Sequence, residues 1–467
     1  MVFSSLAFIF VFLPIVLLFY YISPYKYKNI ILLIFSIIFY TLGEPRYIFL
    51  IIVSMIINYI LSILIYKNRR NIEKKKLILF TIILINITVL VFFKYYSFLI
   101  ENINIIFNIN LKIREISLPL GISFYTFQLI SYIVDVYRGK VVPQRNIINF
   151  SLYVLMFPQL VAGPIVKYSD IEREIEDRKI TINIFGQGVE RFILGLAKKV
   201  IIANNLGSIW MEVKAININE LSLLTAWIGI VAFTLQIYFD FSGYSDMAIG
   251  LGKMFGFNFL ENFNYPYMSK SITEFWRRWH ISLGSWFKEY LYIPLGGNRR
   301  GPLIQFRNII IVWLTTGLWH GASWNFIIWG FYFGFILYFE KVYLKHILNK
   351  LPKFICHLYT MIIVIIGWVF FDANNIRSAI DYIKVMFGSG NIAFDRLGLY
   401  LFNTNIILII ISIVVSTDIL KKTIEKIKKV FNRNDLMLTV FIEFSIFIVS
   451  IAYLVSETYN PFLYFRF

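Results

Sequence analysis

Two histidines and a set of charged and aromatic residues stand inside long apolar stretches of this chain. They fall in three clusters, at residues 238–246, 275–290 and 317–325. A polar group inside an apolar segment is costly to place in lipid, by about 2.5–3.5 kcal/mol on insertion scales, so each one is a candidate functional residue. Besides the histidines, the residues predicted to line a shared cavity are Asp240, Asp246, Arg277, Arg278, Trp319 and Asn325.

His320 is the strongest candidate for chemistry. Its neighbours Gly317, Gly321 and Ala322 are small, which leaves room for a substrate to approach the imidazole. A histidine can accept a hydroxyl proton near neutral pH, as acyl transfer to an alcohol requires. We therefore predict that His320 is a catalytic base. The alternative is a structural histidine whose hydrogen bonds are satisfied at a helix turn.

His280 is the second candidate, and it closes the segment that contains Arg277 and Arg278. We predict that it assists the reaction, by handling the donor or by supporting the inner passage. The alternative is an interfacial histidine that packs beneath Trp276 and Trp279.

The two acids of the first cluster, Asp240 and Asp246, are expected to pair with Arg277 or Arg278. Charged groups away from water need such partners. A structural ion pair is therefore the preferred interpretation of these residues, ahead of direct catalysis.

Other chemistries find no support in the sequence. It contains no HExxH, paired-cysteine or histidine-rich pattern that would predict a metal site. It also contains no GxSxG or P-loop motif. The chain has one cysteine, Cys356, which permits no internal disulfide.

The composition predicts the elements that must position these residues. Of 467 residues, 58% are hydrophobic and 15% are charged, against about 25% charged residues in soluble domains. A membrane-spanning helix needs about 20 mostly apolar residues, and such segments recur along the chain. The candidate spans are 3–22, 29–42, 47–66, 77–98, 117–134, 147–166, 221–239, 303–319, 322–344, 355–371, 402–420 and 436–457.

These spans predict an all-α polytopic membrane protein, with about 11–14 transmembrane helices and re-entrant or interfacial helices around a central cavity. We expect a single membrane domain over residues 1–467, with 240–330 as its catalytic core. Residues 240–296 are rich in Gly, Trp and charge, so an irregular or re-entrant backbone buried within protein is expected there.

The charge distribution predicts the orientation. The net charge is +18, and the excess lies in short loops rather than on a soluble basic face, which argues against nucleic acid as a partner. The positive-inside rule places these loops in the cytoplasm and both termini outside. One crossing, 221–239, then suffices between 166 outside and 303 inside, and 183–206 would lie in the interface or within the protein. The basic loops are 67–76, 138–145, 299–307, 341–353 and 421–433.

Six motifs in order along the chain resemble the membrane-bound O-acyltransferase family, in particular its bacterial branch for alginate O-acetylation. His320 falls on the family's near-universal histidine, and His280 on its second frequent polar position. The motifs are PLGISFY at 119–125, AGP at 162–164, QIYFDFSGYSD at 236–246, FWRRWH at 275–280, YIPLGG at 292–297 and GLWHG at 317–321.

The resemblance implies transfer of an acyl group, most simply acetyl, from a cytoplasmic thioester such as acetyl-CoA to a hydroxyl at the outer face. It implies an extracellular polysaccharide as the final acceptor, a membrane-anchored extracellular acetyltransferase as partner, and a bacterial cell membrane as the location. No permanently bound cofactor or metal is expected. The rival within the family is D-alanyl transfer to teichoic acids, against which Arg277 and the 292–297 motif argue. A transporter or flippase is the alternative from a different class.

The last residues of the chain carry one further motif, Phe-x-Tyr-x-x-Phe over 462–467. It is similar to a terminal motif of extracellular acylation systems related to this family, in which the tyrosine relays the acyl group. A phenol ester is more activated than an alkyl ester and can pass the group on. Tyr464 is therefore a hypothetical acyl relay. The alternative is an aromatic anchor at the membrane interface.

Overall fold

The computed structural model describes residues 2–114, 116–161, 163–390, 392–430, 436–456 and 463. Every regular element within these residues is a helix. The chain divides into two compact units, Met1–Phe192 with Ser245–Leu260, and Ile193–Tyr244 with Glu261–Phe467. These are called unit 1 and unit 2 below.

Unit 1 is built from the N-terminal helices. α4 is the longest of them, with 36 residues. The elements are η1 Phe8–Phe12, α1 Leu13–Ile22, η2 Tyr25–Tyr27, α2 Lys28–Gly43, α3 Ile48–Lys67, α4 Ile72–Phe107, α5 Ile122–Arg138, α6 Ile147–Leu155, α7 Phe157–Leu160, α8 Tyr168–Glu176 and the first part of α9 Ile182–Ala197.

Unit 2 contains the remaining helices, several of them short. α11 supplies residues to both units. The elements are η3 Lys198–Ala203, α10 Asn204–Lys214, α11 Leu223–Met254, η4 Pro266–Met268, α12 Ile272–Arg278, α13 Ile281–Phe287, η5 Lys288–Tyr292, α14 Pro302–His320, α15 Trp324–Phe339, η6 Glu340–Leu344, α16 Lys345–Leu348, α17 Lys353–Asp372, α18 Ile376–Met386, α19 Arg396–Val415, α20 Ile419–Val430 and α21 Leu436–Ser456.

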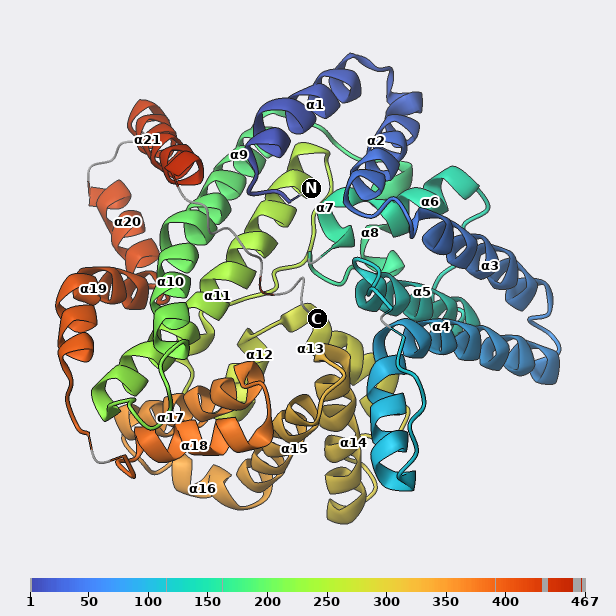
Figure 1. Cartoon of the computed structure of the whole chain (residues 1–467). Coiled ribbons are helices and arrows are strands. Elements are labelled where there is room, and N and C mark those ends of the chain that lie inside the picture. Colours follow the sequence, from blue (N-terminus) through green and yellow to red (C-terminus); the bar gives the residue numbers. More distant parts are fainter. Residues whose placement is uncertain are drawn as a thin grey trace. The chain divides into compact units, whose positions relative to one another are not determined.

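The helices confirm a polytopic all-α membrane protein. Nine helical segments in the described part of the chain are long and apolar enough to cross a bilayer, and a shorter apolar helix covers Phe8–Ile22. α14 and α15 pack against each other in unit 2 (Figure 1). They come close together at Gly317 and Gly330, where an added Cβ on either glycine would lie 3.4 Å from the Cα of the other. Small residues allow such close contact between membrane helices.

The predicted span 147–166 is wrong. α6 ends at Leu155 after nine residues, about 14 Å of helix, which is too short for a bilayer. The Nδ2 atom of Asn29 donates to Asn149 Oδ1 and to the carbonyl of Ile175, both at 2.9 Å. The chain has therefore returned to the level of Asn149 by Ile175. Hydropathy alone could not reveal this return, because the returning segment is also apolar and buried.

The predicted middle of the chain also needs correction. The segments Ile182–Lys214 and Leu223–Met254 both qualify as spans, where one crossing at 221–239 had been expected. Residues 240–254 are regular helix, contrary to the irregular backbone expected there. Glycines permit this arrangement, because an added Cβ on Gly250 would lie 2.6 Å from the carbonyl oxygen of Gly188 in unit 1. In unit 2, an added Cβ on Gly243 would lie 2.7 Å from that of Gly195.

Candidate active site

A helical hairpin in unit 2 forms the first half of the site. Its first arm is α12, and its second arm is α13 continued by η5. Its entry is fixed by Glu340, whose buried carboxylate accepts the N–H groups of Ile272 at 2.7 Å and Thr273 at 2.8 Å. An anion at a helix N-terminus is stabilised by the unpaired N–H groups and by the helix dipole. The chain that leaves the second arm is held by α14, because the Nδ2 atom of Asn308 donates to the carbonyls of Leu295 and Gly297. Both ends of the hairpin are therefore held by hydrogen bonds to neighbouring elements of unit 2.

His280 lies at the turn of this hairpin in a left-handed backbone conformation, with φ of 44°. This conformation is uncommon for residues other than glycine, asparagine and aspartate. An extended segment pairs with both sides of the turn: Asn264 N–H donates to the carbonyl of Arg278, and Ile281 N–H to that of Asn262, each at 2.9 Å. The strained turn is thus held from outside, as expected at a functional site.

The imidazole of His280 is buried and surrounded by aromatic rings. Its centroid lies 4.7 Å from that of Phe241 and 5.9 Å from that of Trp319. Its Nδ1 atom lies 3.1 Å from Oδ1 of Asn262. Burial lowers the pKa of His280 to about 3, so the ring is neutral at pH 7.

His320 is the last residue of α14 and is also buried. Its ring centroid lies 5.0 Å from that of Trp319, 5.1 Å from Trp329 and 5.2 Å from Phe371. Trp319 therefore contacts both histidines, so His280, Trp319 and His320 lie together in unit 2. The indole Nε1 of Trp329 has no hydrogen-bond partner among the described residues.

The small neighbours of His320 serve a purpose other than the predicted one. An added Cβ on Gly321 would lie 2.1 Å from the ring of Phe326, and one on Gly317 would lie 2.1 Å from the carbonyl oxygen of Phe326. These glycines make room for α15, and Phe326 occupies the space expected for substrate. The prediction that they open an approach to the imidazole is wrong.

The predicted ion pairs are wrong as well. Asp240 pairs with Lys199 in unit 2, with Nζ and Oδ1 2.5 Å apart and both side chains buried. Asp246 belongs to unit 1, where it pairs with Arg191 at 2.6 Å. The partner of Arg278 is Glu274, four residues earlier on α12.

The sequence contained a signal for these partners, because Arg191 and Lys199 are bases within an apolar helix. A base and an acid isolated in two apolar helices are each other's simplest partners. Two further residues were predicted to line the cavity. Arg277 is exposed, and the side-chain amide of Asn325 donates to the backbone carbonyl of Ala373.

Tyr464, the hypothetical relay, lies outside the described residues. The residue before it, Leu463, is described and buried. Its N–H donates to Oδ2 of Asp240 at 2.9 Å. Sequence reasoning gave Asp240 a place in the cavity but did not predict this contact with the C-terminal segment.

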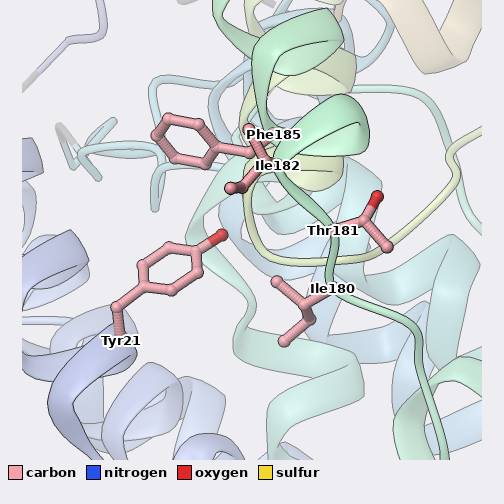
Figure 2. A pocket seen from close by; sticks show the side chains of 5 residues that line it. All are labelled: Tyr21, Ile180, Thr181, Ile182 and Phe185. Atoms are coloured by element: carbon pink, nitrogen blue, oxygen red, sulfur yellow. The ribbon is translucent and has the colours of Figure 1, made fainter.

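Two pockets lie elsewhere in the two units. In unit 1 a pocket of about 260 Å³ is lined by Tyr21, Ile180, Thr181, Ile182 and Phe185 (Figure 2). Its two hydroxyl groups are both engaged: that of Tyr21 donates to the carbonyl of Met254 at 2.7 Å, and that of Thr181 accepts the N–H of Ile184 at 3.3 Å. The rest of the lining is apolar, which offers little for catalysis. In unit 2 a pocket of about 330 Å³ is lined by both apolar and polar residues, the latter including Asp372 and Arg377. Asp372 follows Phe371, which packs on His320.

Comparison with known proteins identifies the family of the chain. The model of the membrane-bound O-acyltransferase family matches residues 141–379, which include both histidines. The "Probable alginate O-acetylase AlgI" of Azotobacter vinelandii is 42% identical over 395 residues, covering 84% of this chain and 79% of the relative. The "Peptidoglycan O-acetyltransferase" of Helicobacter pylori is 36% identical over 433 residues, covering 85% and 82%.

A third relative is less similar and matches a smaller part of the chain. The "Teichoic acid D-alanyltransferase" of Bacillus subtilis is 28% identical over 237 residues, covering 48% of this chain and 60% of the relative. The family match over half of the chain and the extended identity to the acetylases leave no ambiguity at the family level. The chain belongs to the membrane-bound O-acyltransferase family.

Proposed function

We propose that this O-acyltransferase moves an acetyl group from a cytoplasmic thioester, most simply acetyl-CoA, across the bacterial cell membrane for O-acetylation of an extracellular polysaccharide. The observation that carries the proposal is the pair of buried histidines, His280 and His320, in contact with one tryptophan, Trp319. The names of the similar proteins support acetyl over D-alanyl, because the D-alanyltransferases match only about half of this chain. In this proposal residues 1–467 act as one catalytic domain with its core at 240–330.

The proposed orientation follows from the basic loops and keeps both termini outside. The ends of α1 and α2 near Asn29 then lie on the cytoplasmic side, and so does Ile175, which Asn29 contacts. Two crossings follow, outward through 182–214 and inward through 223–254. This pair of crossings preserves the cytoplasmic position of 299–307 that the charge pattern requires.

The same orientation supports access to the two histidines from opposite sides. Lys214, at the outer end of the first of these crossings, pairs with Asp372 at 2.7 Å, next to Phe371, which packs on His320. His320 then faces the outer side, where the acceptor arrives. Glu340 at the base of the hairpin follows α15 towards the basic segment 341–353, so His280 is reached from the cytoplasmic side, where the thioester arrives.

In the proposed reaction His320 accepts the proton of an acceptor hydroxyl. The oxygen attacks the carbonyl carbon of the thioester, a C–O bond forms, the C–S bond breaks, and the thiolate leaves and takes up a proton. General-base catalysis contributes about 10²–10⁴-fold. His280 assists by contacting the donor in its passage.

The acceptor at this step is proposed to be Tyr464, which would pass the acetyl group to a membrane-anchored extracellular acetyltransferase. The buried contact of Leu463 with Asp240 supports this proposal, because Leu463 immediately precedes the tyrosine. Tyr464→Phe deletes the nucleophile and keeps the aromatic ring. Loss of polymer acetylation in this variant is expected, and normal acetylation would leave the aromatic-anchor interpretation.

The test of the proposed function uses purified protein in lipid discs with acetyl-CoA labelled in the acetyl group. We expect the wild type to release free thiol and to transfer the label from the thioester. The rate of label transfer should fall by about 100-fold or more in His320→Gln. His346→Gln is the matched control, because His346 is an exposed histidine. Undiminished transfer in His320→Gln would contradict the role of His320. Thioester-independent movement of an intact solute in liposomes, without label transfer, would instead favour a transporter.

A further inference from the structure

Asn262 is completely buried, and its side-chain oxygen faces three nitrogen or oxygen atoms. Oδ1 accepts from the backbone N–H of Ser282 at 3.2 Å and from the Ser282 hydroxyl at 2.9 Å. It also lies 3.1 Å from Nδ1 of His280. Asn262 takes no part in the reaction proposed above, and it lies outside the six motifs that resemble the family.

The contact with Ser282 fixes the orientation of the Asn262 amide. A backbone N–H can only donate, so the atom that faces it must be the amide oxygen and not Nδ2. That oxygen has no hydrogen to give. The hydrogen between Oδ1 and His280 must therefore be on Nδ1 of the imidazole.

We propose that Asn262 is a positioning residue that holds His280 as the Nδ1–H tautomer and leaves Nε2 as the nitrogen that works on the acyl donor. In a neutral imidazole one nitrogen donates and the other accepts, and the partner of the first decides the role of the second. This inference rests on the proposed function, in which His280 assists acyl transfer.

The backbone of Asn262 contributes to the same end. Its carbonyl accepts the N–H of Ile281 at 2.9 Å, directly after the left-handed residue His280. One residue therefore holds the turn through its main chain and the ring through its side chain. The aromatic contacts with Phe241 and Trp319 restrict the remaining rotation of the ring. A neutral ring held in this way presents a lone pair, so Nε2 can accept a hydrogen bond or a proton and cannot donate one.

The tautomer can be measured directly, because the chain has only four histidines. Protein labelled with ¹⁵N-histidine in lipid discs gives separate signals for protonated and bare ring nitrogens, and His280→Gln assigns those of His280. We expect a protonated Nδ1 and a bare Nε2 in the wild type at pH 7. The same pattern is expected in the matched control Ser282→Ala. This variant removes the hydrogen bond from the Ser282 hydroxyl to Asn262 and keeps the contact of Asn262 with the His280 ring.

Two substitutions of Asn262 then separate positioning from packing. Asn262→Leu removes the acceptor, so the fixed Nδ1–H pattern is lost and transfer falls by about tenfold or more. Asn262→Asp keeps an acceptor of the same shape, so the tautomer and most of the transfer rate are retained. Its added negative charge favours the protonated ring, and the acid limb of the pH–rate profile therefore moves to higher pH.

The inference would be overturned by a bare Nδ1 in the wild type, or by an unchanged Nδ1–H pattern in Asn262→Leu. Neither result would contradict the proposed function. Full transfer in Asn262→Leu, at a pH where His280→Ala is inactive, would overturn it as well. Full transfer in His280→Ala would instead refute the role of His280 in the proposed function. The wild-type spectrum and Asn262→Asp decide the matter even if Asn262→Leu does not fold.

Discussion

Lys199 and Asp240 form a buried ion pair in unit 2, with Nζ of the lysine 2.5 Å from Oδ1 of the aspartate. The second oxygen of Asp240 accepts the N–H of Leu463. One carboxylate thus pairs with a buried lysine and accepts the backbone N–H of Leu463, the residue before Tyr464. The pair lies beside the candidate active site in sequence, because Asp240 and Phe241, which packs on His280, are neighbours on α11.

Breaking this pair from one side should destabilise the protein. Asp240→Asn removes the carboxylate that pairs with the buried Lys199, and loss of one partner of a buried ion pair costs about 3–5 kcal/mol. The expected result is a lower midpoint of thermal unfolding in detergent. The double variant Lys199→Met with Asp240→Asn should recover part of the loss, because both charges of the pair are then absent.

Asp381→Asn is the control for that experiment. Asp381 pairs with Lys384 at 3.0 Å in an exposed position, where ion pairs contribute only about 0–1 kcal/mol. A midpoint for Asp240→Asn no lower than that of Asp381→Asn would show that the Lys199–Asp240 pair is not needed for stability.

The contact between α14 and α15 predicts a second stability difference. Gly317→Ala would place a methyl group 2.1 Å from the carbonyl oxygen of Phe326, so the two helices must separate, at a cost of about 1–3 kcal/mol. Because His320 ends α14, transfer activity should fall as well. Gly284→Ala on α13 meets its nearest atom at 3.8 Å and should leave both properties near wild type. Equal unfolding midpoints for the two variants would contradict this packing.

The hairpin that carries His280 depends on the carboxylate of Glu340. Glu340→Ala leaves the N–H groups of Ile272 and Thr273 without their acceptor in a buried position, which costs about 1–3 kcal/mol. We expect reduced acyl transfer from protein that still reaches the membrane, and partial recovery in Glu340→Gln, which keeps one acceptor oxygen. Full activity in Glu340→Ala would show that the cap does not position the hairpin.

The two crossings in the middle of the chain can be tested by cysteine labelling in a Cys356→Ser background. Asn219→Cys follows α10, and Ile182→Cys begins α9 at an exposed position. A membrane-impermeant maleimide should label position 219 in intact cells and position 182 only after permeabilisation. Labelling of both positions from the same side would refute the crossing through 182–214.

Sequence reasoning reached the helices and the two histidines because each leaves a local signal. Apolar runs of sufficient length predicted α2, α3, α14 and α17 to within two residues at each end, and the motif around His320 stood out by its composition. The return of the chain after α6 was missed because a helix that ends at Leu155 and a helix that continues through 166 have equally apolar sequences. Only the long-range contact of Asn29 with Ile175 distinguishes them.

The partners within the site were not predictable in the same way. Pairing Asp240 with Lys199 requires knowledge of which faces of two helices meet, and the closer arginines of α12 misled the assignment. Asn262 gave no signal, since its function depends on a single oxygen placed between His280 and Ser282. The small size of Gly317 is visible in the sequence. The sequence could not show that the space beside this glycine is filled by Phe326.

The central claim is that His320 is the base for acyl transfer, and the O-acetyl content of the extracellular polymer tests it most directly. Cells that produce His320→Gln at wild-type membrane levels should release polymer whose ester content is that of cells lacking the protein. Cells that produce His346→Gln should match the wild type. Wild-type ester content with His320→Gln would contradict the account, because the proposed reaction needs His320 to accept the hydroxyl proton.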